Sequence, residues 1–278
     1  MNIPSVRLVA AVALAGVIAA GCDVKVGDNG VSVDLARGQA TDEWTRTYTL
    51  PAGGQLDIVN GNGPIEAIGT SGSQVVVRVE RRVRAGLEET AADFLKKVEM
   101  REDVTPDRVR IEAIADERAL RGFGRARLDV RYFVQVPAGL TLSFRTSNGG
   151  IRLDDVDGRI VAVTTNGGIT GNDLSGSVDM LAVNGGLQVG MASVSGDVKL
   201  STTNGGVRLD LPRDARANLD ASCVNGGINI DDEFNVDTSG EGARRRVSAS
   251  LNGGGARITA ATVNGGIRIR ARGPAESE

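Results

Sequence analysis

The tripeptide Asn-Gly-Gly recurs through the second half of the chain and limits the possible folds more than any other feature. Its copies begin at Asn148, Asn166, Asn184, Asn204, Asn225, Asn252 and Asn264. Successive copies are 18, 18, 20, 21, 27 and 12 residues apart. A step near 20 residues is typical of repeat proteins in which one coil of chain stacks on the next. The sequence therefore predicts an architecture of repeated short coils.

The residues around most of these copies alternate in polarity. The residues two, four and six positions before Asn204, for example, are Thr202, Leu200 and Val198, all apolar or small. This period of two is the signature of a β-strand. A second short strand follows each copy, and a second glycine corner precedes the next copy at Gly158, Gly176 and Gly196. A coil is thus strand, Asn-Gly-Gly, strand and glycine corner.

Two all-β folds fit this pattern: a β-solenoid with parallel stacked strands, or an antiparallel meander in which each Asn-Gly forms a type I′ hairpin turn. The solenoid is favoured, because stacked asparagines can hydrogen-bond as a ladder, and Asn and Gly tolerate left-handed corners. We expect a single-stranded β-solenoid with coils of about 18–21 residues. The expected corner ladder is Asn148, Asn166, Asn184, Asn204, Asn225 and Asn264, with a second, partial ladder of Thr146, Thr164, Thr202 and Thr262.

Some segments interrupt the repeat. Asn252 breaks the alternation, so it occupies the other corner of its coil or begins an added hairpin. Residues 231–246 form a polar insertion, and residues 87–100 have the apolar spacing of an amphipathic helix, which we expect to cover an end or side of the stack. Cys223 falls in the inward frame and is expected to be a buried small side chain. The solenoid domain spans residues 42–271, and residues 272–278 form a disordered tail.

The N-terminus resembles an export signal. Residues 1–21 hold Arg7, then a short apolar run from Leu8 to Ala20. The sequence Ala19-Ala20-Gly21-Cys22 resembles the bacterial lipobox, which implies that Cys22 carries acyl chains such as palmitate and becomes the mature N-terminus. The alternative is an ordinary signal peptide cut near Gly21. Residues 22–41 are expected to form a polar tether with one short strand at Val31–Leu35. Asp23 resembles a signal that retains lipoproteins at the inner membrane of some bacteria.

A larger part of the chain, residues 45–270, resembles the bacterial putative-adhesin family of exported β-solenoid proteins. The resemblance rests on the opening corner VNGNGPIEAIG, the helical segment after it, the TNGGI-type corners and the closing VSASLNGGGARITAATVNGGIRIR. It implies membrane attachment and cell-surface adhesion, and some relatives are associated with envelope stress. No catalytic residues are carried over from the family.

Several kinds of chemistry are excluded or disfavoured. The chain has no histidine, which excludes Ser-His-Asp and Cys-His catalysis and His-ligated metal sites. A net charge of −3 gives no sign of nucleic-acid binding. The basic residues Arg81, Arg82, Arg84 and Arg244–Arg246 are interpreted as solvated. Gly122-Phe123-Gly124 lacks the third glycine of a nucleotide-binding loop.

Two acidic groups are candidate sites. Asp154, Asp155 and Asp157 could bind calcium, but their spacing fits neither an EF-hand nor the calcium-binding nonapeptide repeat, so we expect solvated turn residues. Asp231, Asp232 and Glu233 are the candidate carboxylates of a polysaccharide-active enzyme. They lie in an insertion without other cleft-forming loops, so no catalytic residue, metal or cofactor is expected.

Three functions remain open at this stage. The first is a non-catalytic, lipid-anchored envelope protein that adheres or scaffolds through a rigid surface. The second is an envelope-stress sensor or regulatory module that binds a membrane protein, and the third is a polysaccharide-active enzyme. Expected partners are the membrane, through the N-terminal lipid, and an unknown protein or glycan. The outward residues Val161, Val163, Leu181 and Val183 form an apolar area that another segment covers or a partner contacts.

Overall fold

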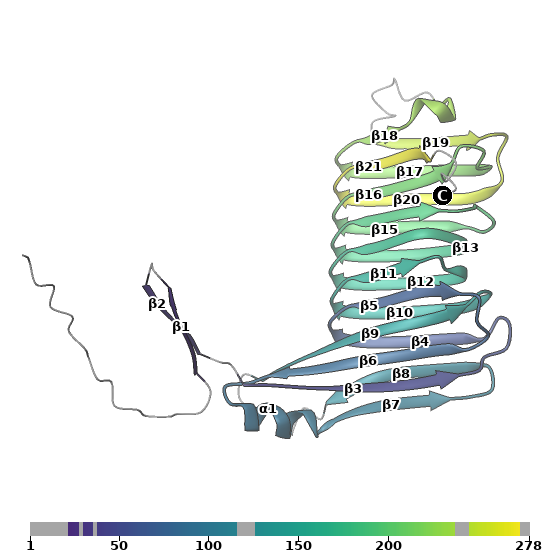
Figure 1. Cartoon of the computed structure of the whole chain (residues 1–278). Helices are drawn as coiled ribbons and strands as arrows, with labels where there is room; N and C mark the ends of the chain where they lie inside the picture. Colours follow the sequence, from purple (N-terminus) through teal and green to yellow (C-terminus); the bar gives the residue numbers. More distant parts are fainter. Residues whose placement is uncertain (1–21, 28–29, 36–37, 116–125, 237–244, 273–278) are drawn as a thin grey trace, which may run out of the picture.

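The structure is a computed structural model that describes residues 22–27, 30–35, 38–115, 126–236 and 245–272. The protein is all-β, as predicted, with 69% strand and one α-helix among the described residues. Its strands form a tall, β-solenoid-like stack of short coils (Figure 1). Within the described residues, no helix is long and apolar enough to span a membrane.

Most coils contribute one strand to each of two sheets, and in these coils the chain turns from the first sheet to the second at an Asn-Gly corner. Sheet I contains, in spatial order, β7 (Val98–Val104), β8 (Arg108–Ala115), β4 (Gln55–Asn62), β10 (Leu140–Asn148), β12 (Asp157–Asn166), the second half of β13 (Ile169–Asn184), β15 (Val198–Asn204), β20 (Ala256–Asn264), β17 (Ala217–Asn225) and β19 (Arg246–Leu251). Sheet II contains β3 (Gln39–Tyr48), β6 (Val75–Arg84), β9 (Arg127–Pro137), β5 (Ile65–Thr70), β11 (Ile151–Asp154), the first half of β13, β14 (Leu187–Met191), β16 (Val207–Pro212), β21 (Ile267–Arg272) and β18 (Ile228–Ile230).

Neighbouring coils pair in parallel and in register. Asn148 lies beside Asn166, which lies beside Asn184, and the strands that lead to these corners pair residue by residue. Parallel pairing along the stack rules out the antiparallel meander, because hairpins joined by type I′ turns would pair antiparallel. Among the described strands, antiparallel pairing with the stack occurs only at its ends, at β3, β6, β7 and β19.

The coils do not stack in the order of the chain. The last coil, β20–β21, lies between β15–β16 and β17–β18, so Asn264 sits between Asn204 and Asn225. At the other end, β8 and β9 pair with β4 and β5 on the side away from β10 and β11. Asn225 therefore does not follow directly on Asn204 in the stack, although it is the next ladder asparagine in the sequence. Figure 1 shows the yellow C-terminal strands inside the stack rather than at its tip.

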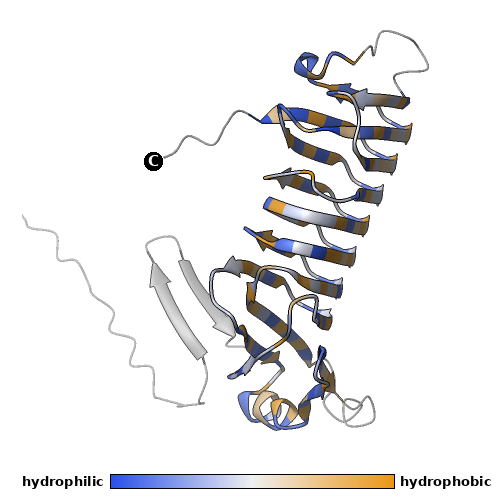
Figure 2. Cartoon of the chain, turned by 90° about the vertical axis from the view of Figure 1, so that its right-hand side faces the viewer, coloured by the Kyte–Doolittle hydropathy of each residue, from blue (hydrophilic) through white to orange (hydrophobic). Residues whose placement is uncertain are grey.

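The core lies between the two sheets and runs the length of the stack. Inward positions along each strand are apolar and buried, among them Phe144, Leu200 and Ile258. The intervening residues face outward, so the strands show alternating apolar and polar bands (Figure 2). This alternation is what the spacing before each Asn-Gly-Gly predicted.

The helix is shorter than expected. α1 spans Glu88–Leu95 and packs Ala91, Phe94 and Leu95 onto a small apolar cluster at the β3–β6 end of the stack. The predicted segment 87–100 was wrong at its C-terminal side. Residues from Val98 onward belong to β7, where they pair antiparallel with β8.

The segment around Asn252 connects two strands of sheet I. β19 pairs antiparallel with β17 as an edge strand, and β20 lies on the other side of β17. Asn252 lies in the turn between β19 and β20, with φ 47°, and its Nδ2 donates to the carbonyls of Arg213 and Ala215 at 2.9 Å each. A tight β19–β20 hairpin does not form, because β17 lies between the two strands. The predicted insertion 231–246 holds a 3-10 turn at Asp232–Phe234 and the start of β19, and its residues 237–244 lie outside the described residues.

The N-terminal region holds an antiparallel hairpin of β1 (Cys22–Gly27) and β2 (Gly30–Leu35). The expected tether 22–41 therefore contains one more strand than the sequence suggested, and β3 begins at Gln39, ahead of the expected domain start at residue 42. The predicted signal peptide, residues 1–21, lies outside the described residues. The predicted tail is residues 272–278. Arg272 is the last residue of β21, and residues 273–278 lie outside the described residues.

Candidate interaction surface

The six predicted ladder asparagines and Asn62 form one column at the corners. Each of the six predicted asparagines donates its side-chain Nδ2 to the Oδ1 of the neighbour on the Asn62 side, over 2.7–2.9 Å. The spatial order is Asn62, Asn148, Asn166, Asn184, Asn204, Asn264 and Asn225. All side-chain hydrogen bonds of the column therefore run in one direction, and Asn62 at one end acts only as an acceptor in it.

The glycines explain the rest of the corner motif. A Cβ on the first glycine, as at Gly185, would lie 2.0 Å from the carbonyl oxygen of Gly167 in the next coil. None of the ladder asparagines has a positive φ. Tolerance of the left-handed conformation is thus the wrong reason for Asn here, and the reason for the first Gly is the closeness of the neighbouring backbone.

The threonine column bonds differently from the expectation. The hydroxyls of Thr146, Thr164, Thr202 and Thr262 are buried and donate to a corner glycine carbonyl of the adjacent coil, over 2.8–3.1 Å. The threonine hydroxyls do not donate to one another, because each donates to a backbone carbonyl. Each hydroxyl therefore ties one coil to the next beneath the asparagines.

Two groups of apolar side chains lie on the outer surface of sheet I beside these asparagines, one on β12–β13 and one on β20–β17, with Ser201 and Thr203 of β15 between them. We call Val163, Leu181, Val183, Val224 and Val263 the corner strip. Leu181 and Val263 are each 40% exposed and Val224 is 56% exposed, while Val163 and Val183 are half-buried. Leu181 pairs in register with Val163 on the neighbouring coil. Val161, which the sequence placed in the same area, lies opposite Asp179 and is half-buried.

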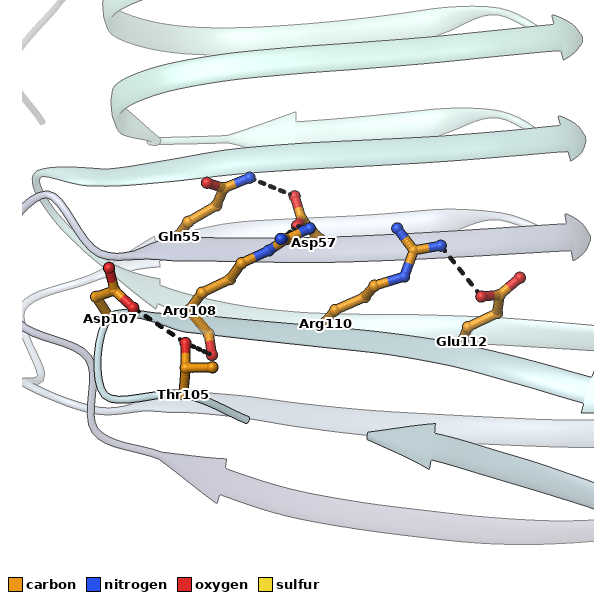
Figure 3. Close-up of polar contacts among 7 residues, drawn as sticks. All are labelled: Gln55, Asp57, Thr105, Asp107, Arg108, Arg110 and Glu112. Atoms are coloured by element: carbon orange, nitrogen blue, oxygen red, sulfur yellow. Dashed lines mark hydrogen bonds and ion pairs between the residues drawn. The ribbon is translucent and has the colours of Figure 1, made fainter. Parts of the chain in front are cut away.

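Polar side chains replace the apolar ones toward the β7–β8 end of sheet I. Asp57 faces outward on β4, yet only 1% of it is exposed, because Arg108 from β8 folds over it. Arg108 Nε lies 2.6 Å from Asp57 Oδ2, and Gln55 Nε2 lies 2.8 Å from Oδ1 (Figure 3). Both carboxylate oxygens thus accept structural hydrogen bonds, and the bond from Arg108 joins β8 to β4. Arg110 and Glu112 form a second pair along β8 at 3.2 Å.

Of the aspartates that are candidate calcium ligands, Asp154 is bonded to protein side chains. Partial burial raises the pKa of Asp154, but bonds from Arg152 and Asn172 outweigh it and lower that pKa below its ordinary value. Asp155 adopts φ 56° at the second corner. Among the described residues, no group of three or more Cys, Asp or Glu side chains could hold a metal ion.

The candidate catalytic carboxylates lie at the β18 end of the stack. Asp231 Oδ2 accepts from the backbone N–H of Ala271 at 3.1 Å, and Glu233 pairs with Arg213 at 3.1 Å. Asp232 begins the 3-10 turn. They act as an end cap, and nothing in their geometry sets two carboxylates across a groove.

The arginines of the two basic clusters lie in different surroundings. Arg81 points inward and forms a two-pronged bond with Asp42 while also donating to the carbonyl of Val98. Arg82 and Arg84 line an outer hollow of about 530 Å³ that also holds Glu80 and Asp129. Arg245 and Arg246 are exposed, whereas Arg244 and Gly122-Phe123-Gly124 lie outside the described residues. Cys223 is buried, as its inward frame predicted.

A scan against protein-family models matches residues 90–270 to the family described as Toastrack DUF4097. The chain belongs to the Toastrack family. This confirms the resemblance to the putative-adhesin family. A search of curated proteins found no match to the chain.

Solved structures resemble the Toastrack stack at low identity. A putative cell adhesion protein from Clostridium sporogenes is 12% identical, with a TM-score of 0.40, over 84% of this chain and 100% of that one. A putative adhesin from Bacteroides fragilis is 9% identical, with a TM-score of 0.27, over 83% and 97% of the two chains. A putative lipid binding protein from Parabacteroides distasonis is 9% identical, with a TM-score of 0.29, over 83% and 95%.

Sequence reasoning missed two features of this Toastrack protein. Asn62 begins the ladder, and its signal was the Asn62-Gly63 pair, which Pro64 follows in place of the second glycine. The second is a charged hollow on sheet II, described below, whose signal was the alternating arginines of β21.

Proposed function

We propose that the protein is a non-catalytic, lipid-anchored component of the cell envelope, in which a single-stranded β-solenoid presents a rigid surface for adhesion or scaffolding. The observation that carries this proposal is the exposed corner strip beside the hydrogen-bonded asparagine column. Exposed apolar side chains held on a stiff sheet support contact with another macromolecule. Because the strip is apolar, its partner in this proposal is a protein, while the membrane is reached through Cys22.

The anchor is tested by fractionation of cells that express the chain. Acyl chains on Cys22 would bury many methylenes in the bilayer, each contributing about 0.8 kcal/mol. Replacing Cys22 with Ser is expected to move the protein from the membrane fraction to the soluble fraction. A Cys223→Ser variant is the matched control and is expected to stay in the membrane. Retention of the Cys22→Ser protein in the membrane would contradict the anchor.

The adhesive surface is tested on intact cells. External protease is expected to release the stack, and a Leu181→Asp variant is expected to lower attachment of the cells to protein-coated surfaces. Asn229→Asp, an exposed change on sheet II, serves as the control for added charge. Protection of the chain from external protease would contradict surface display and favour a sensor on the periplasmic side.

A further inference from the structure

Sheet II carries a polar hollow of about 530 Å³ that arises because Gly190 has no side chain. Gly190 lies on β14 in register with Asp210 of β16, in a column that continues to Arg270 on β21. The neighbouring positions in the column hold the polar side chains of Asp210 and Arg270, so the lack of a side chain at Gly190 leaves a recess in the outer face. Two of these strands, β16 and β21, are labelled in the upper part of the stack in Figure 1.

A bulge next to Gly190 shapes one wall of the hollow. The register between β13 and β14 shifts between Gly171 and Leu174, and Asp173 takes a left-handed φ of 54°. Asp173 Oδ1 accepts from Arg272 Nη1 at 2.5 Å. This hydrogen bond raises the pKa of Arg272 and draws its guanidinium across the hollow, 3.6 Å from where a Cβ on Gly190 would lie. Bulges and left-handed non-glycine residues occur often beside functional sites.

The opposite wall has more guanidinium groups than carboxylates to pair with them. Arg208 pairs with Asp210 at 3.2 Å, and Arg208 also lies directly opposite Arg268 in the register. Like charges opposite each other on neighbouring strands destabilise a sheet. Among the described residues, the side chains of Arg268 and Arg270 have no hydrogen-bond or ion-pair partner. Arg270 lies opposite Asp210 in the register, but Asp210 pairs with Arg208, so the Arg270 guanidinium is available to an anion in the hollow.

We propose that this hollow binds an acidic saccharide, that is, a sugar that carries a carboxylate or phosphate group. Arg270 and Arg272 hold the anionic group, because guanidinium forks match the oxygens of carboxylates and phosphates. Asn172, Gln188 and Asp210 on the walls bond to the sugar hydroxyls. The lining offers little for an acyl chain, since Val189 points inward and is only 2% exposed.

The test measures binding of a trigalacturonate, a sugar phosphate, inorganic phosphate and anionic phospholipid vesicles to the purified full chain. At least one of the two acidic sugars is expected to bind more tightly than inorganic phosphate. Added salt is expected to weaken the binding of the sugar, because it screens the charges. Arg270→Ala is expected to weaken binding about 10-fold or more, as expected for loss of a charged hydrogen bond. Gly190→Gln, which fills the hollow where only ordinary contacts arise, is expected to abolish it.

The control is Arg257→Ala, which removes an exposed arginine from sheet I and is expected to leave binding unchanged. Equal binding by wild type and Arg270→Ala would overturn the proposal, as would binding of vesicles without binding of either sugar. Inorganic phosphate binding as tightly as the sugars, or no binding at all, would overturn it too. The site is independent of the corner strip, so Leu181→Asp is expected to bind these sugars normally.

Discussion

At the scale of single residues, the two glycines of a corner have different reasons to be there. A Cβ at Gly185 would lie 2.0 Å from a backbone oxygen of the neighbouring coil, whereas one at Gly186, the second glycine of the same corner, would lie 3.3 Å from the nearest oxygen. At Gly227, the second glycine of the corner at the end of the stack, a Cβ would meet nothing within 4 Å. Backbone atoms held in a parallel register cannot shift without breaking the pairing. Gly185→Ala is therefore expected to lower the free energy of unfolding by about 3 kcal/mol, the upper end of the range for overpacking.

Gly227→Ala is the matched control in denaturant melts of both variants. Its alanine falls in open space at the spatial end of the stack, so a change within about 0.5 kcal/mol is expected. Equal losses in the two variants would show that conformational freedom, rather than closeness of the neighbouring coil, selects glycine at these corners.

The direction of the asparagine column allows a second residue-scale prediction. Asn62 accepts from Asn148 Nδ2, while Asn225 at the other end donates to Asn264 Oδ1. Asn62→Asp keeps the acceptor and makes the bond charge-assisted, so stability is expected to be unchanged or slightly higher. Asn225→Asp places a carboxylate against an amide oxygen, and a loss of about 1 kcal/mol is expected from the lost bond.

Thermal unfolding of both variants at neutral pH measures the difference. Below pH 3, where the new carboxyl groups are protonated and can donate, the Asn225→Asp variant is expected to approach the wild type. Equal effects of the two substitutions would contradict the one-way column.

At the scale of elements, two side chains of β3 join this strand to Glu102 on β7 at the helix end, and Arg46 forms the weaker link, an ion pair at 3.6 Å. Tyr48 on β3 donates its hydroxyl to Glu102 on β7 at 2.5 Å. Burial of the phenol, followed by this bond, raises the pKa of Tyr48 above its ordinary value near 10. A raised pKa in the folded state means that the bond's stabilisation is fully present below pH 10 and is lost as pH rises further.

Tyr48→Phe tests this link between β3 and β7. At pH 7 the variant is expected to be less stable by about 1–3 kcal/mol, as for loss of a bond to a charged group. Above pH 10 the difference from wild type is expected to shrink, because the wild type loses a contribution that phenylalanine never made. Urea melts at several pH values measure it, and a constant difference from pH 7 to pH 11 would contradict the role of the phenol.

Local patterns explain which elements the sequence could reveal. The alternation before each corner identified the strands, since a two-sided coil must bury every second residue. The helix was found but extended too far, because Val98 fits both the helical spacing and a strand. Only tertiary pairing with β8 decides in favour of β7. The charged hollow depends on a bulge in β13 and on neighbours far apart in the sequence, which no local pattern specifies.

At the scale of the whole molecule, the order of the coils is the feature that the repeat could not reveal. Asn-Gly-Gly specifies that coils stack in register, but each corner fits every other corner equally well. The turn from β19 to β20 decides the order, because it passes β17 and returns the chain into the stack between β15 and β17. The C-terminal strands are thereby paired on both sides, whereas β18 pairs only with β21 among the described strands.

Hydrogen exchange can distinguish this order from stacking in chain order. Backbone amides of β21 are expected to exchange more slowly than those of β18, although β21 is nearer the chain end. Removing residues 256–278 is expected to leave β17 and β18 without their parallel neighbours and to abolish their protection. Removing residues 273–278 alone is the control and is expected to leave the protection of both strands unchanged. If the longer truncation kept β17 and β18 protected, the outer coil could dock directly on β15–β16, and the inserted position of β20–β21 would not be what holds it.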